Sequence, residues 1–248
     1  MYRNLRVGVV IPALNEEQSI ALVVTGLRAL RNEDQSTVVD ELVVCDNGST
    51  DATALRARDA GASVVHEPER GYGKACLAAL GALQRSDVTL FIDGDHAFDP
   101  AQATTLLDGI ANGADLVIGS RSLGHTAQHA LAPGQALGNH IICTVIRRLW
   151  GQRVTDLGPY RAIRVQALAR LNMTDTRFGW TVEMQVKALQ LGLKMIEIPV
   201  DTRVRIGTSK ISGTLRGAIL ASSGILYMIF KLRWRQFRRK PITEAIQP

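Results

Sequence analysis

Two aspartates stand one residue apart where a strongly apolar segment ends. Residues 88–92 read VTLFI, and Asp93, Gly94 and Asp95 follow directly. Carboxylates this close repel each other, and each loses hydration beside a buried strand. Hard divalent cations such as Mg²⁺ and Mn²⁺ prefer carboxylate oxygens, and Mg²⁺ usually shares them with substrate phosphates. The pair therefore indicates a metal site, although a capped turn, with Asp95 or Asp99 serving the next helix, is the alternative.

Two glycine-containing stretches carry cations suited to a phosphate. Lys74 lies in RGYGKA, where a glycine-rich approach to a helix can bring backbone N–H groups and one cation to an anion. Arg205 and Lys210 flank IGTS, a loop that can close over a diphosphate and neutralise a leaving group. The alternatives are an ordinary loop with a solvated lysine and a basic surface loop.

These residues need a scaffold, and the first 120 residues supply one by alternating strand and helix patterns. Apolar runs predict strands over residues 5–11, 41–46, 62–66, 88–93 and 114–120, and helices are predicted over 15–30, 73–84 and 100–110 and from 51 onward. This alternation is typical of an α/β fold with a mostly parallel central sheet and helices on both faces. Ligands of such sheets bind beyond the carboxyl ends of the strands. The residues at or just after these ends are Asn15, Asp46, Asp93, Asp95 and Arg121.

Local signals predict where two of these helices begin. Glu16 and Glu17 stand in the first turn of the helix predicted over 15–30, where the helix dipole favours acids. Ser49 or Thr50 can cap the helix predicted from residue 51.

The pattern changes after residue 121. Residues 122–134 are polar and contain glycine and proline, which predicts a loop. Beyond it, helices are predicted over 136–151 and 181–192, a short strand over 160–165, and an edge strand over 194–204 that Pro199 interrupts.

The composition predicts one large domain, or one domain with a tail. With 248 residues, of which 46% are hydrophobic and 21% charged, the chain can bury a substantial core, and disorder is excluded. Residues 1–6 are polar and the apolar run after them stops at Pro12, so we expect no signal peptide. Cys45, Cys76 and Cys143 are odd in number and far apart in apolar contexts, which favours reduced thiols in the cytoplasm.

Charge divides the chain unevenly. The net charge of +6 combines residues 1–120, with 9 Lys and Arg against 17 Asp and Glu, and residues 121–248, with 20 against 6. An acidic half and a basic half suggest different ligands, or different ends of one ligand. Nucleic acid, a phosphorylated lipid and an anionic membrane surface are candidates for the basic half.

The motifs of the first half resemble a known family. VVIPALNEE, CDNGSTDAT, ERGYGKA, DGDHAFDP and ADLVIGSR occur in this order between Val7 and Arg121, and together they resemble the nucleotide-sugar half of family 2 glycosyltransferases with the GT-A fold. VTDLGPYRAIR, GWTVEMQVKA and RVRIGTSKISGT resemble the polyprenyl-phosphate branch, the dolichyl-phosphate mannose or glucose synthases. The resemblance implies one GT-A catalytic domain over 1–213, with a nucleotide-sugar half (1–121) and an acceptor half (122–213), then a helix and basic tail (214–248).

The resemblance also implies roles for residues that match its motifs. The nucleotide sugar would be bound by Pro12, Ala13, Asn15, Glu16, Asp46, Lys74 and Asp93, with Asp46 accepting a hydrogen bond from the base. Asp93 and Asp95 would hold Mg²⁺ or Mn²⁺ against the diphosphate, and Arg205 and Lys210 would act with Asp95 in catalysis. Where a common synthase pattern has a glutamine that assists the metal, this chain has Ala97.

Four residues of the second half are candidates for the acceptor. Arg121 and Arg161 would bind an acceptor phosphate, because guanidinium forks match phosphate geometry. Asp156 and Glu183 are candidates for a general base or for positioning. A phosphate acceptor needs little help from a base, because its second pKa is about 6. A turn cap for Asp156 and a helix-face residue for Glu183 are the structural alternatives.

The carboxyl tail combines apolar and basic residues. Between Arg216 and Lys231 lie 14 uncharged residues, fewer than the roughly 20 that a spanning helix needs. One interpretation is a helix packed on the domain. The other is a helix at a membrane surface, with Trp234 and Phe237 among six basic residues from Lys231 to Lys240.

The leading hypothesis is a metal-dependent inverting glycosyltransferase. It would move a hexose from a nucleotide diphosphate sugar, of the UDP-glucose or GDP-mannose type, to a polyprenyl phosphate at the cytosolic membrane face. One alternative is a family 2 enzyme with a soluble hydroxyl acceptor. An alternative of another class is a non-catalytic nucleotide-sugar or membrane-binding protein. We expect no nucleic-acid partner, because no recognised motif accompanies the basic tail.

Overall fold

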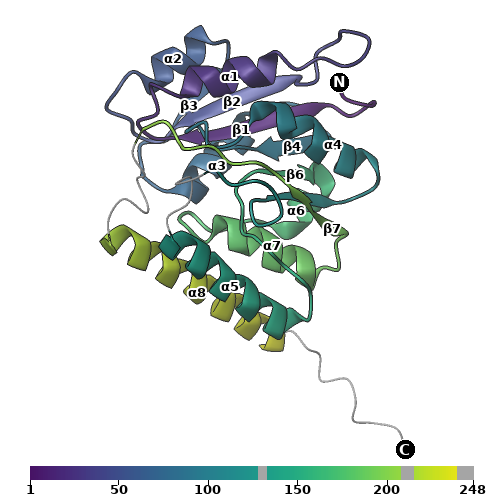
Figure 1. Ribbon diagram of the computed structural model, residues 1–248, viewed down its shortest axis with the longest axis vertical. Helices are drawn as coiled ribbons and strands as arrows, with labels where there is room; N and C mark the ends of the chain where they lie inside the picture. The colour runs from purple at the N-terminus through teal and green to yellow at the C-terminus, as the bar shows by residue number, and fades with distance from the viewer. Residues whose placement is uncertain (128–132, 208–214, 239–248) are drawn as a thin grey trace, which may run out of the picture.

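A seven-stranded sheet organises the protein, in the order β3-β2-β1-β4-β6-β5-β7 (Figure 1). The computed structural model describes residues 1–127, 133–207 and 215–238. The strands are β1 (Val7–Ala13), β2 (Glu41–Asp46), β3 (Ser63–His66), β4 (Val88–Phe91), β5 (Leu116–Ser120), β6 (Arg161–Arg164) and β7 (Met195–Pro199). β1 is buried along its whole length, as expected of a central strand covered on both faces.

The sheet is mostly parallel, as predicted, but one strand runs the other way. β1 pairs in parallel with β2 and β4, and β5 pairs in parallel with β7. β6 lies antiparallel between β4 and β5, and Arg161 pairs with Phe91 of β4 and Ile118 of β5. Because of this reversal, the first residue of β6 lies beside the carboxyl ends of its two neighbours.

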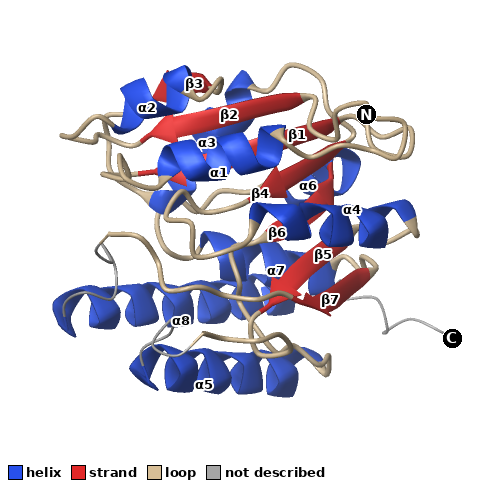
Figure 2. Cartoon of the chain, turned by 45° about the horizontal axis from the view of Figure 1, so that its top comes forward, coloured by secondary structure: helices blue, strands red, loops and turns tan. Residues whose placement is uncertain are grey.

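Helices cover both faces of the sheet (Figure 2). They are α1 (Ile20–Arg28), α2 (Thr53–Asp59), α3 (Tyr72–Ala82), α4 (Ala103–Ala111), α5 (Pro133–Trp150), α6 (Val165–Leu171), α7 (Trp180–Gln190) and α8 (Leu215–Arg238), with a short 3₁₀ turn, η1 (Pro100–Gln102), before α4. Buried side chains of α1, α2 and α4 pack in one core, and those of α3, α6 and α7 pack in a second core. The predicted arrangement is confirmed.

α5 and α8 form a further layer outside α7 (Figure 1). Ile146 of α5, Val186 of α7 and Ile229 of α8 are fully buried in a third apolar cluster. The prediction of a tail helix packed on the domain is confirmed for this face of α8.

The starts of α1 and α2 differ from the sequence prediction. Glu16 and Glu17 precede α1, whose first turn holds no acid. α2 begins after Ala52 with no side-chain cap. Instead, Glu17 accepts a hydrogen bond from the backbone N–H of Ala52, and Ser49 accepts one from Asn15. The helix-start residues are therefore used to join the loops that follow β1 and β2.

Candidate active site

A cavity of about 520 Å³ lies at the carboxyl ends of β1 and β4. It brings together seven of the residues singled out from the sequence, Pro12, Ala13, Asn15, Glu16, Asp93, Asp95 and Arg205. These residues come from three regions of the chain and meet because parallel strands end at the same edge of the sheet. The cavity therefore lies at the edge of the sheet where the sequence predicts the site.

Asp93 is held at the cavity by the hydroxyl of Tyr72. The Tyr72 Oη donates to Asp93 Oδ1 over 3.0 Å. Burial first, and then repulsion from Asp95, raise the pKa of Asp93 to about 7, although the Tyr72 hydrogen bond acts to lower it. Burial also raises the pKa of Tyr72 well above its usual value, so its hydroxyl remains a proton donor. Two carboxyl groups in this setting have the chemistry to hold a cation, which would relieve their repulsion.

Asp95 is fixed by its own loop and by Arg205. Its Oδ1 accepts from the Ala97 N–H over 3.0 Å, and its Oδ2 lies 3.2 Å from Arg205 Nη1. The backbone N–H of Ile206 donates to the Asp95 carbonyl over 3.0 Å, so the segment bearing Arg205 is attached to the aspartate loop. Ala97 packs against the core and offers no ligand. Lys210 lies outside the described residues.

Hydrogen bonds join the loop after β1 to the loop after β2. Asn15 adopts a φ of 53°, and its side-chain Oδ1 accepts from the Thr50 N–H over 2.8 Å. The Glu16 N–H donates to Thr53 Oγ1 over 2.7 Å. These hydrogen bonds fix the loop that carries Asn15 and Glu16, and both residues line the cavity.

Asp46 lies at the carboxyl end of β2 but is not a lining residue of the cavity. Its Oδ1 accepts from the Ser49 N–H over 3.0 Å, and its Oδ2 lies 3.2 Å from His66 Nδ1. Both oxygens therefore have partners within the protein, and the carboxylate organises the loop beside the cavity. The contact with a nucleotide base stays a prediction.

The glycine-rich segment at the start of α3 is used differently from the prediction. A Cβ at Gly71 would lie 2.2 Å from the carbonyl oxygen of Thr176, and one at Gly73 would lie 2.1 Å from that of Asp175. The glycines are needed because a second loop packs directly on them. The N–H groups of Gly73 and Lys74 donate to carbonyls of that loop, so they are engaged within the protein.

Lys74 itself turns away from the cavity. Its ammonium pairs with Glu69, and neither residue lines the cavity. The neighbouring Arg70 does line it.

Several residues that line the cavity were not assigned to the site by the sequence reasoning, among them Asn47, Arg70, Tyr72, Arg177 and Phe178. Arg70 and Tyr72 belong to a motif already singled out, ERGYGKA, so their types were a usable signal. Asn47 likewise belongs to CDNGSTDAT, directly after Asp46. Its side chain donates to the carbonyls of Glu67 and Glu69 and accepts from the Gly71 N–H, and it thereby shapes the loop that carries Arg70.

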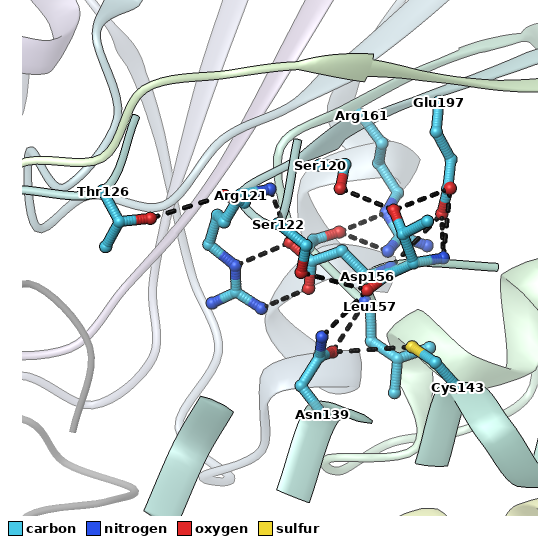
Figure 3. A network of polar contacts seen from close by, with 12 residues as sticks. Ser120, Arg121, Ser122, Thr126, Asn139, Cys143, Asp156, Leu157, Arg161 and Glu197 are labelled. Atoms are coloured by element: carbon cyan, nitrogen blue, oxygen red, sulfur yellow. Dashed lines mark hydrogen bonds and ion pairs between the residues drawn. The ribbon is translucent and has the colours of Figure 1, made fainter. Parts of the chain in front are cut away.

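Arg121, directly after β5, forms an ion pair with the buried carboxylate of Asp156 (Figure 3). Arg121 Nε and Nη2 donate to the two carboxylate oxygens over 2.8 and 2.7 Å, and its backbone N–H donates over 2.8 Å. Both oxygens of Asp156 are thus occupied. The geometry favours a positioning role for Asp156, which orients Arg121.

Arg161 and Glu183 are both occupied inside the protein. Arg161 is fully buried, and its guanidinium donates to the carbonyls of Gly158 and Thr181. Burial lowers its pKa to about 10. Glu183 is fully buried, accepts from the Thr174 N–H and Oγ1, and pairs with Lys187. Neither residue lines the cavity that contains Asp93 and Asp95, and the structural alternative for Glu183 is the one the geometry favours.

The three cysteines are buried and free, as predicted.

Known relatives of this chain are glycosyltransferases. The chain is 36% identical over 221 residues to an uncharacterised glycosyltransferase of Mycobacterium tuberculosis, a match that covers 87% of this chain and 94% of the relative. It is 29% identical to an undecaprenyl-phosphate mannosyltransferase of Micrococcus luteus, covering 86% and 90% of the two chains. It is 30% identical to a dolichyl-phosphate hexose transferase of Haloferax volcanii, covering 87% and 91%.

The fold is shared with solved GT-A structures. Glucosyl-3-phosphoglycerate synthase from Mycobacterium tuberculosis, crystallised with Mn²⁺, UDP-glucose and phosphoglyceric acid, superposes with a TM-score of 0.74 at 24% identity, over 93% of this chain and 80% of the other. The expected GT-A architecture is therefore confirmed. The sequence pattern of glycosyl transferase family 2 matches residues 8–171. The chain is accordingly a glycosyltransferase and belongs to glycosyl transferase family 2.

Proposed function

We propose that this glycosyltransferase moves a hexose from a nucleotide diphosphate sugar, of the UDP-glucose or GDP-mannose type, to a polyprenyl phosphate, with inversion. The observation that carries the proposal is the meeting of Asp93, Asp95 and Arg205 in one cavity at the carboxyl edge of the sheet. Carboxylates and a guanidinium side by side suit a metal-bound diphosphate, because the cation and the arginine share its negative charge.

Asp93 and Asp95 are the residues that would hold Mg²⁺ or Mn²⁺. Their side chains line the same cavity, and the raised pKa of Asp93 reflects a burial and repulsion that a cation would relieve. In residues 1–127, 133–207 and 215–238, no cluster of three or more His, Cys, Asp or Glu offers a complete protein ligand set. This fits a cation that completes its coordination with diphosphate oxygens and water. When bound, the cation would stabilise charge on the departing nucleoside diphosphate.

The transfer would be a single displacement. An oxygen of the acceptor phosphate attacks the anomeric carbon, and the bond from that carbon to the diphosphate oxygen breaks as the new bond forms. The acceptor is already largely anionic at neutral pH, since its second pKa is about 6, so no side chain has to remove a proton. Arg205, paired with Asp95, would stabilise the leaving group, and Arg121, paired with Asp156, would orient the acceptor.

Two relatives support a lipid acceptor by their names, which include undecaprenyl-phosphate and dolichyl-phosphate. The second candidate is a soluble acceptor, and the observation in its favour is the shared fold of a synthase crystallised with phosphoglyceric acid. We call the cavity that contains Asp93, Asp95 and Arg205 the donor cavity. Both candidate acceptors carry a phosphate, so the residues of the donor cavity alone do not separate them.

The outer face of α8 supports contact with a membrane surface. Tyr227, Phe230, Trp234 and Phe237 are each more than half exposed on this face. Arg238 lies over the Trp234 ring at 5.1 Å, and Lys231 lies over the Tyr227 ring at 5.7 Å. Aromatic rings beside cations suit the interface of an anionic membrane. No helix among the described residues has the length and apolarity needed to cross a bilayer. From the exposed rings and cations of this face, we propose peripheral attachment at the cytosolic face.

The test is a transfer assay with separate acceptors. The purified full-length protein is incubated with Mn²⁺ and radiolabelled UDP-glucose or GDP-mannose, and with a polyprenyl phosphate, the matching polyprenol or 3-phosphoglycerate. Label should move only to the polyprenyl phosphate, and NMR should show the opposite anomeric configuration to the donor. Transfer to 3-phosphoglycerate alone would establish the soluble candidate instead. Retained configuration would contradict single displacement.

A further inference from the structure

A second cavity, of about 780 Å³, lies in the acceptor half, between α5 and the loop that follows β5. One face of α5 forms a wall, with Asn139, His140, Cys143, Thr144 and Arg147 at helical spacing. Arg121 and Arg153 contribute to the rest of its lining. We call it the α5 cavity.

The α5 cavity has an excess of positive charge. Asp156 is its single acidic lining residue among those described, and both of its carboxylate oxygens are bound to Arg121. Arg147 and Arg153 are exposed in the cavity and have no carboxylate partner in the part of the chain that the structure describes. Two guanidinium groups without an acid beside them favour an anion, and their planar forks match a phosphate.

Arg121 relates the α5 cavity to the donor edge of the sheet. It lines the α5 cavity and directly follows β5, whose carboxyl end lies at the same edge of the sheet as those of β1 and β4. Asp156 fixes the guanidinium through Nε and Nη2, which leaves Nη1 available to a ligand (Figure 3). An anion bound in the α5 cavity would therefore have an N–H donor of Arg121 available in addition to Arg147 and Arg153.

We propose that the α5 cavity is the acceptor site, and that Arg147 and Arg153 bind the phosphate monoester of the acceptor. This inference rests on the proposed function and adds the residues that recognise the acceptor. A phosphate monoester is common to a polyprenyl phosphate and to a soluble phosphorylated acid, so the cavity chemistry serves either source.

Arg148 provides a matched control. It is the next residue of α5, it is exposed, and it does not line the α5 cavity. Arg147→Ala and Arg153→Ala should each raise the acceptor KM about tenfold or more, because each removes a charge-assisted hydrogen-bonding fork. Arg148→Ala should leave it unchanged. The donor KM should stay the same in all three variants. Arg147→Lys should recover part of the loss, since it restores the charge but not the fork.

The experiment also measures binding without turnover. Isothermal titration of the full-length protein uses a short, water-soluble prenyl phosphate, the matching prenol and 3-phosphoglycerate, with no donor present. Binding of the prenyl phosphate but not the prenol, weakened in Arg147→Ala and Arg153→Ala relative to Arg148→Ala, supports the site even if no transfer is found. The same pattern with 3-phosphoglycerate identifies a soluble source. Equal acceptor binding in all three arginine variants overturns the proposal, even where wild-type transfer confirms the proposed function.

Discussion

The side chain of Asp156 is almost wholly buried, and three N–H groups of Arg121 donate hydrogen bonds to its two carboxylate oxygens. A carboxylate held in this way serves as an anchor for the arginine. The orientation of Arg121, whose side chain is 21% exposed, is fixed by these hydrogen bonds. Because a buried arginine without its partner is unfavourable, both residues depend on the pair.

Replacing Asp156 tests whether it anchors or removes protons. Asp156→Ala should lower the free energy of unfolding by about 3–5 kcal/mol, since it leaves Arg121 largely buried and unpaired. It should also raise the acceptor KM, because Arg121 loses its orientation. Asp201→Ala, at an exposed carboxylate, is the control. Denaturant unfolding and steady-state kinetics provide the two measurements. A large fall in kcat at unchanged stability and unchanged KM would identify Asp156 as a base instead.

Asp95→Asn should abolish metal-dependent transfer and preserve the fold. The amide oxygen can still accept from the Ala97 N–H, whereas the charge that pairs with Arg205 and would bind the cation is lost. The measurement is transfer across a Mn²⁺ and Mg²⁺ titration, together with the melting temperature. Asp99→Asn is the control, because Asp99 caps the 3₁₀ turn outside the donor cavity. Wild-type activity in Asp95→Asn would remove this carboxylate from the metal site.

Tyr72→Phe should weaken Mn²⁺ binding in the presence of a nucleoside diphosphate by about tenfold, the scale found when a hydrogen bond to a metal ligand is lost. The phenol oxygen lies 3.0 Å from Asp93 Oδ1, and the ring itself would be retained. Tyr2→Phe makes the same chemical change at a hydroxyl that binds Asp108, outside the donor cavity. Mn²⁺ affinity can be followed by electron paramagnetic resonance. Identical affinity in the two variants would show that Tyr72 supports the wall of the cavity only.

The exposed face of α8 should bind anionic vesicles. Replacing Phe230 and Trp234 together by serine should reduce co-sedimentation with anionic vesicles severalfold, with donor affinity unchanged, because the donor cavity lies elsewhere. Leu22 and Leu55 are exposed on α1 and α2, and their double serine variant is the control. Point changes are preferable to truncation after Phe230, which would remove the buried Leu232 from the core of this layer. Equal sedimentation of both variants would leave α8 as a packing helix.

The cysteines should resist thiol reagents at pH 8 until the protein unfolds. Burial raises the pKa of Cys45 and of Cys143 to about 12, and that of Cys76 well above its usual value, so almost no thiolate forms. The folded-state pKa exceeds the unfolded value of about 8.5, so this contribution to stability is present below about pH 8.5 and falls as the pH rises toward 12. Titration with a chromogenic disulfide, with and without urea, measures the reactivity. Rapid labelling of a folded thiol would contradict the burial.

Several parts of the fold could be predicted from local pattern. β1 and β4 are continuous apolar runs because both faces are covered, and such runs are visible in the sequence. The reversal of β6 was not predictable, because a four-residue strand carries the same pattern in either direction. That reversal places Arg161 at the active edge of the sheet and also buries it, which no local signal indicated.

The sequence by itself determined which residue types follow the strands, and so it located Asp93, Asp95 and the donor edge. Only the tertiary structure decided which polar side chains at this edge of the sheet are bound by other residues of the protein. Arg121 and Asp156 are 35 positions apart and Tyr72 and Asp93 are 21 apart, yet each pair is in direct contact. The physical reason is that strand ends follow from local hydrophobic periodicity, whereas the partner of a polar side chain depends on how distant segments pack. Arg161 and Arg147 look alike in the sequence, and packing buries one against carbonyl groups and leaves the other in the α5 cavity.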